Sequence, residues 1–73
     1  MYPNPTPGNL FFEFNRDDIT KIMLFDHLGK PLFERPVTQN IEEIDLSDLP
    51  EGFYIVRIEA PDEILIRKVA KMN

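Results

Sequence analysis

The 73-residue chain has no cysteine and no tryptophan, and it has only one histidine, His27, and one serine, Ser47. Without thiols it can form no disulfide framework and offers no thiolate nucleophile or metal ligand. Zinc binding needs several ligands, and no second histidine accompanies His27, which we expect to be a solvated turn residue beside Gly29. A Ser-His-Asp hydrolase is not indicated either, because no glycine elbow surrounds Ser47.

Glycine and long hydrophobic runs are also scarce. The three glycines, Gly8, Gly29 and Gly52, each mark a separate turn and form no phosphate-binding loop. No uninterrupted apolar run exceeds four residues, whereas a membrane-spanning helix needs about 18 to 20. No N-terminal signal peptide precedes Tyr2. We therefore expect no membrane span, and we interpret residues 1–73 as a single domain excised from a longer secreted precursor.

Acidic residues outnumber basic ones by 13 to 8, and the net charge of -5 opposes the basic footprint of a nucleic-acid-binding protein. The carboxylates do not form a recognisable site. Asp45, Asp48 and Glu51 lack the ligand spacing and central glycine of a calcium loop, and the polar stretch 15–18 is typical of a hairpin loop. We expect no metal, no cofactor and no catalysis.

Apolar residues make up 42% of the chain, which indicates a folded domain, and their dominant spacing of two predicts strands. The expected strands are 10–14, 20–25, 31–35, 41–46, 53–59 and 64–72. The rows expected to face the core are Leu10, Phe12 and Phe14; Ile22 and Leu24; Ile44 and Leu46; and Tyr54, Val56 and Ile58. Gly29 is expected to close the Asp26–Lys30 turn with a positive φ, and Pro31 and Pro36 confine the strand between them to a sheet edge.

Two segments leave alternatives. Residues 42–49 also fit a short helix that Pro50 would stop, although we favour a strand. In the last strand, Ile64 and Ile66 share one face while Val69 lies on the other. A bulge or a sharp twist near Arg67 is expected to reconcile them.

Six or seven short strands without a confident helix predict an all-β fold, namely a small antiparallel, immunoglobulin-like β-sandwich. The segment 49–54, Leu-Pro-Glu-Gly-Phe-Tyr, is similar to the tyrosine corner of immunoglobulin-like and fibronectin type III domains, in which a tyrosine hydroxyl bonds back to upstream backbone. Tyr54 is the candidate for that hydroxyl. Gly52 is expected to have a positive φ or to pack closely at this corner.

The order of four segments resembles that of a known family. The chain opens with Tyr2-Pro3-Asn4-Pro5, continues through the 26–30 turn and the 49–54 corner, and ends in the basic strand Arg67-Lys68-Val69-Ala70-Lys71. Over residues 2–71 this order resembles the type A C-terminal sorting domain of the type IX secretion system (Por secretion) of Bacteroidetes.

The resemblance implies a non-catalytic signal that follows an unknown cargo domain and directs it through the periplasm to the cell surface or the extracellular space. The implied partners are the outer-membrane translocon and a sortase-like processing protease that cleaves upstream of the domain. The recognition residues implied by the resemblance are Asp26, Gly29, Gly52, Tyr54, Arg67, Lys68, Val69 and Lys71.

Two other classes of function stay open. One is a fibronectin type III-like binding or adhesion module that touches carbohydrate through Phe11 or Phe53, although the absence of tryptophan favours the sorting domain. An enzyme comes third. The basic end of the chain is either read by a negatively charged receptor or simply blocks edge-to-edge aggregation. Charge reversal at Lys68 and Lys71 is expected to separate these two roles.

Overall fold

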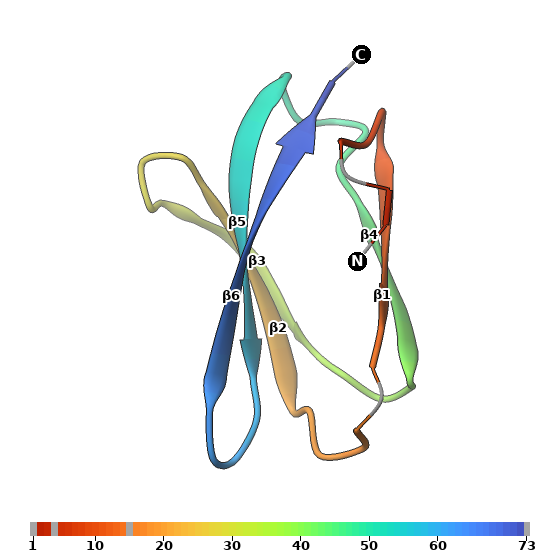
Figure 1. The fold of residues 1–73 in the computed structure, drawn as a ribbon. Helices are drawn as coiled ribbons and strands as arrows, with labels where there is room; N and C mark the ends of the chain where they lie inside the picture. The colour runs from red at the N-terminus through yellow and green to blue at the C-terminus, as the bar shows by residue number, and fades with distance from the viewer. Residues whose placement is uncertain (1, 4, 15, 73) are drawn as a thin grey trace.

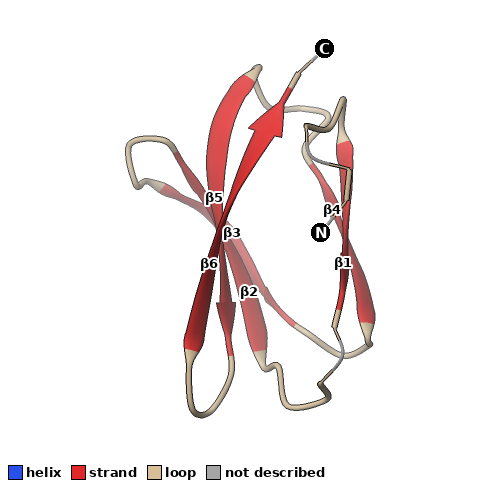
Figure 2. Cartoon of the chain, viewed as in Figure 1, coloured by secondary structure: helices blue, strands red, loops and turns tan. Residues whose placement is uncertain are grey.

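The computed structural model describes residues 2–3, 5–14 and 16–72, and this part of the chain is all β-strand and loop, without a helix (Figure 2). Predictions that involve Met1, Asn4, Asn15 or Asn73 lie outside the described residues. The strands are β1 (Asn9–Glu13), β2 (Lys21–Asp26), β3 (Pro31–Pro36), β4 (Ile41–Asp45), β5 (Gly52–Glu59) and β6 (Ile64–Lys71).

The strands form two antiparallel sheets that face each other as two layers (Figure 1). β1 pairs with β4 in the smaller sheet, and the larger sheet has the order β3-β2-β5-β6. The chain crosses between the layers three times, because each sheet contains strands that are not consecutive in sequence. The predicted immunoglobulin-like sandwich is confirmed, with six strands in the described part of the chain.

The core lies between the two layers and is built from alternate residues of the strands. The buried apolar side chains are Leu10, Phe12, Ile19, Ile22, Leu24, Ile44, Leu46, Tyr54, Val56, Ile58 and Val69. Each predicted inward row therefore faces the core, and Phe14 packs against it from a partly buried position. The strand interpretation of residues 41–46 is also confirmed, because Ile41–Asp45 form β4 and the helical alternative is not adopted.

The predicted tyrosine corner is present where the chain enters β5. The hydroxyl of Tyr54 donates a hydrogen bond to the backbone carbonyl of Pro50 at 2.5 Å, and the Tyr54 ring is buried. Gly52 has a φ of 151°, a value that side-chain-bearing residues rarely adopt. This corner fixes the crossing from the small sheet to the large one.

The turn between β2 and β3 also forms as expected. Gly29 has a φ of 85°, and its N-H donates to the Asp26 carbonyl at 3.0 Å. β3 lies at an edge of the larger sheet, with Pro31 and Pro36 at its two ends. The proline-based edge assignment is therefore confirmed.

Of the bulge or sharp twist expected near Arg67, the bulge is wrong. β5 and β6 pair in unbroken register from Gly52 with Lys71 to Glu59 with Ile64. Ile64 and Ile66 instead remain on the outer face of the sheet, where they are 51% and 52% exposed. The smaller sheet covers only the inner face of the larger one, so an apolar residue on the outer face needs no change of register to be accommodated.

The N-terminal segment ties the two layers together on the side of β1 and β6. Tyr2 forms an antiparallel bridge to Phe11 in β1, and Thr6 forms a parallel bridge to Lys71 in β6. The Thr6 N-H donates to the Ala70 carbonyl at 2.9 Å, and the Met72 N-H donates to the Thr6 carbonyl at 2.9 Å. The beginning and the end of the described chain are thus held side by side.

Candidate functional site

Most of the predicted recognition residues lie at one end of the sandwich, around the tyrosine corner. Tyr54 is the register partner of Asp26 on one side and of Val69 on the other, and Gly52 is the partner of Lys71. Gly29 lies at the nearby β2–β3 turn. Arg67 and Lys68 lie farther along β6, toward the opposite end. The structure therefore brings six of the eight residues together, with Gly29 joined to Asp26 through the turn, and Arg67 and Lys68 follow along β6.

The predicted residues also differ in accessibility. Tyr54, Val69 and Lys71 are 5%, 0% and 4% exposed, so their side chains face the protein interior. The Lys71 ammonium donates to the backbone carbonyls of Leu49 at 2.7 Å and Ser47 at 3.4 Å, in the connection between β4 and β5. Lys71 therefore holds this connection against β6, and it does not contribute its charge to an exposed basic cluster.

Asp26 organises the β2–β3 turn with its side chain. One carboxylate oxygen accepts hydrogen bonds from the backbone N-H groups of Leu28 and Lys30, both at 2.9 Å. These bonds, the one from Lys30 first, lower the pKa of Asp26 below its ordinary value of 3.8. The charge of Asp26 is thus part of the turn that displays Gly29.

The Asp26 turn gives a prediction about acid stability. A carboxyl whose pKa is lowered by folding contributes stability that is complete above its unfolded pKa and is lost as the pH falls through its folded pKa. Asp26→Asn should therefore lower the thermal midpoint at neutral pH, and the difference from wild type should shrink as the pH falls below 3.8. Thermal melts across a pH series measure this. Asp17→Asn, the same change at an exposed loop residue, is the control, and a pH-independent effect of Asp26→Asn would contradict the prediction.

Arg67 and Lys68 are the exposed basic residues of the predicted set. The Lys68 ammonium lies 4.3 Å from the centroid of the Phe53 ring, a cation–π contact on the outer face of the larger sheet. Arg67 donates from Nη1 to the backbone carbonyl of Ile66 at 2.9 Å. These two side chains place positive charge along β6 on an otherwise acidic chain.

A hollow of about 200 Å³ lies at the tyrosine corner. Its lining is mainly apolar and includes Leu32, Leu49, Pro50, Phe53 and Tyr54, with Asp26 among the polar residues at its rim. The other titratable residues in the lining are His27 and Glu51, and Asp26 already accepts two backbone hydrogen bonds within the turn.

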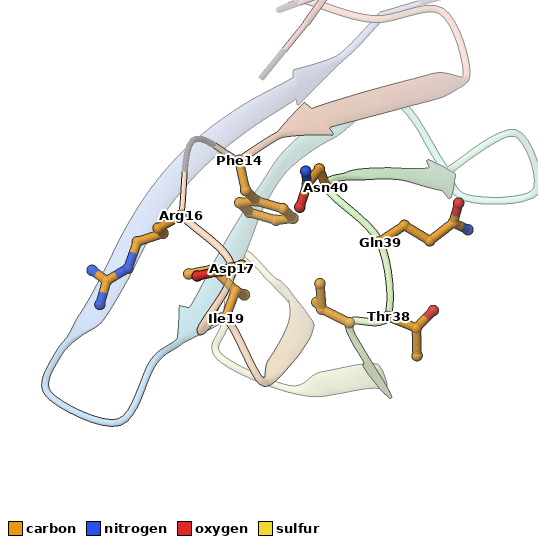
Figure 3. A pocket seen from close by; sticks show the side chains of 8 residues that line it. Phe14, Arg16, Asp17, Ile19, Thr38, Gln39 and Asn40 are labelled. Carbon is orange, nitrogen blue, oxygen red and sulfur yellow. The ribbon is translucent and has the colours of Figure 1, made fainter.

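A second hollow, of about 160 Å³, lies at the opposite end of the sandwich (Figure 3). The ring of Phe14 lies beside Asn40, and Arg16 extends away from the hollow.

The Arg16 guanidinium reaches the β5–β6 turn, where it pairs with Asp62 at 2.8 Å and with Glu63, and it also pairs with Asp18. The bonds from Arg16 lower the pKa of Asp18, and the carboxylates raise the pKa of Arg16. This cluster ties two loops together.

Within residues 2–3, 5–14 and 16–72, no group of three or more histidine and acidic side chains is placed to hold a metal ion. No helix in the same residues is long and apolar enough to cross a membrane.

The sequence analysis expects Phe53 as a candidate contact residue, but it misses the exposed isoleucines of β6. Phe53, Ile64 and Ile66 are each about half exposed on the outer face of the larger sheet, at 53%, 51% and 52%. The signal was present in the sequence, because Ile64 and Ile66 have the parity opposite to Val69. The bulge or sharp twist expected from that mismatch is not needed to explain it, because the mismatch marks an exposed apolar face.

The fold and these surfaces define the class of the protein, a small all-β sandwich domain of the immunoglobulin-like type. The profile of the secretion system C-terminal sorting domain matches residues 1–72. The chain therefore belongs to the C-terminal sorting domain family of the type IX secretion system. A comparison with curated proteins finds no match.

This family assignment identifies the chain as a C-terminal sorting signal for type IX secretion. Domains of this family mark proteins for export to the cell surface or the extracellular space, which implies an interaction with the secretion machinery. The family is consistent with a source in Bacteroidetes, and such sorting domains are generally non-catalytic.

Proposed function

We propose that the chain is a non-catalytic domain that follows a cargo domain and carries it, through the periplasm and the outer-membrane translocon, to the cell surface. A sortase-like protease then removes the domain from the cargo by cleavage upstream of it. The observation that carries this proposal is the family match over residues 1–72, which spans every strand of the sandwich.

The arrangement of the chain ends supports recognition of the folded domain. Tyr2 pairs with β1, and Met72 pairs with Thr6 beside β6, so both ends of the matched region belong to one hydrogen-bonded unit. A receptor that binds β6 therefore binds a strand whose position depends on the folded sandwich. In this proposal Tyr54, Val69 and Lys71 act by fixing the fold, while Gly29, Arg67 and Lys68 are exposed.

A fusion experiment tests the proposal. Residues 1–73 are joined through a short linker to the C-terminus of a periplasmic reporter and expressed in a host with a working type IX system. We expect the reporter at the cell surface, shortened by the length of the domain because the protease has removed it. Retention in the periplasm, while a known sorting domain exports the same reporter, would contradict the proposal. The same fusion in a translocon-deficient strain is the matched control.

The carbohydrate-binding alternative depends on free aromatic faces. The Phe11 ring stacks with Tyr2 at a centroid distance of 5.7 Å, and Lys68 lies over the Phe53 ring. Both candidate aromatic residues therefore already have one ring face in contact with another side chain.

A further inference from the structure

The inference concerns the free edge of β6, which is the outer strand of the larger sheet (Figure 1). In an antiparallel ladder, alternate residues direct both their N-H and C=O groups toward the same neighbour. The Ala70 carbonyl accepts from Thr6 on the side away from β5. Because the β5–β6 register is unbroken, Ile64 and Ile66 direct their backbone groups to that same side. Among the described residues, no strand pairs with Ile64 or Ile66 there.

The other strand edges are each interrupted at some point, as is usual in natural sheets. β3 begins and ends with proline, which has no N-H to donate. On β1, Tyr2 exchanges two backbone hydrogen bonds with Phe11, at 2.9 and 2.7 Å. On β4, the side chain of Arg35 donates to the Glu43 carbonyl. The beginning of β6 lacks both a proline and a covering segment of described chain.

Arg67 shows how this edge accepts a donor. Its guanidinium donates to the Ile66 carbonyl at 2.9 Å, in the direction from which the N-H of an added strand would approach. Such a strand would replace this contact and free the guanidinium to bind one of the strand's own side chains. Ile64 and Ile66 are about half exposed beside the edge and provide apolar contact for the same strand.

The positive charge of β6 distinguishes between the strands that could pair with its edge. A second copy of this chain paired about Arg67 along the same edge would place the two Arg67 side chains opposite each other, and opposing like charges destabilise a strand pair. A strand that carries carboxylates on the face of Arg67 would meet this cation favourably. The charge of the edge therefore favours an acidic extended segment.

We infer that residues 64–68 of β6 form a strand-addition site for an extended acidic segment of the export machinery. The backbone of that segment pairs with Ile64 and Ile66, and its apolar side chains pack beside these two residues on the outer face. Its carboxylates lie on the opposite face of the segment, where they bind Arg67. The inference rests on the proposed function for the identity of the partner, whereas the pairing chemistry belongs to the edge itself.

Two synthetic peptides test the pairing on the 73-residue protein, one of alternating valine and glutamate and one of alternating valine and lysine. We expect the acidic peptide to bind, to protect the Ile66 amide from hydrogen exchange, and to bind more weakly as salt is added. Failure of the acidic peptide to bind, or equal binding of the two peptides, would overturn the inference.

Variants locate the site. Ile66→Pro removes the outward N-H while leaving the bonds to β5 in place, and it should weaken acidic-peptide binding by about tenfold or more, whereas Ile66→Ala keeps the N-H and should bind within a few-fold of wild type. Wild-type affinity in a folded Ile66→Pro variant would overturn the inference.

If this variant does not fold, the pair Arg67→Glu and Lys68→Glu replaces it and should reverse the preference toward the lysine peptide. An unchanged preference would overturn the inference.

The export fusion separates this inference from the proposed function. We expect the charge-reversed pair to reduce surface delivery of the reporter while the domain stays folded. Normal export by a variant that no longer binds the acidic peptide would overturn the role of this edge and leave the proposed function standing. Failure of the wild-type fusion to reach the surface would contradict the proposed function, and the peptide measurements would still decide whether the edge adds a strand.

Discussion

Lys71→Glu is expected to destabilise the domain by about 3 kcal/mol or more, enough to remove most of the stability of a small domain. The Lys71 ammonium is buried and donates to the carbonyls of Leu49 and Ser47. A carboxylate at this position cannot donate, so both carbonyls lose their partner. It would also face the nearby Asp45, whose pKa is lowered by hydrogen bonds from Ser47 and by the positive charge of Lys71. Chemical denaturation monitored by circular dichroism measures the loss.

Two matched variants interpret the result. Lys71→Met keeps the apolar stem but removes the donor, and we expect it to lose about 1 to 3 kcal/mol. Lys68→Glu makes the same charge change at an exposed position on the neighbouring residue and should alter stability by less than about 1 kcal/mol. Equal effects of Lys71→Glu and Lys68→Glu would contradict the structural role given to Lys71. Charge reversal in export experiments should therefore use Arg67 and Lys68.

The strands and core rows could be predicted because period-two alternation is a local property of the sequence. Tyr54, Val56 and Ile58 illustrate this, since each alternate position in β5 faces the core. The turn at Gly29 and the corner at Gly52 were also predictable, because a positive φ strongly favours glycine. The edge position of β3 followed from its two prolines.

The burial and hydrogen bonding of the basic residues could not be predicted in the same way. Arg67, Lys68 and Lys71 look equivalent in sequence, but alternation places Lys71 on the inner face, and only the three-dimensional path of residues 47–49 supplies carbonyls for its ammonium. The bridge from Thr6 to Lys71 joins residues from the two ends of the described chain. Such contacts depend on the packing of distant segments, which local patterns do not specify.

The exposure of the outer face of β6 could not be predicted for a related reason. The opposite parity of Ile64 and Ile66 relative to Val69 leads the sequence analysis to expect a bulge or a sharp twist, because apolar residues are usually buried. The structure leaves them exposed, since the smaller sheet has only two strands and covers one face of the larger sheet. How many strands lie in each layer is a property of the topology, and the spacing of residues within one strand does not report it.

Gly52→Ala and Gly52→Val are both expected to lower stability, by about 1 to 3 kcal/mol each, through strain in the backbone. Gly52 has a φ of 151°, and no atom lies within 4 Å of the position that a Cβ would occupy. Added side chains therefore meet no steric barrier, so the penalty comes from the backbone conformation and appears with the first carbon. A strained Gly52 would also displace the corner at which the Tyr54 hydroxyl bonds to Pro50.

Gly8→Ala is the matched control, because Gly8 is buried but has no strained positive φ, and its added Cβ would lie 3.5 Å from the Ser47 Cβ, an ordinary contact. We expect this change to shift stability by less than about 1 kcal/mol. Thermal and denaturant unfolding of the three variants give the comparison. If alanine at Gly52 were tolerated and only valine were destabilising, the cause would be side-chain crowding, and the account of this corner as a backbone-determined turn would be wrong.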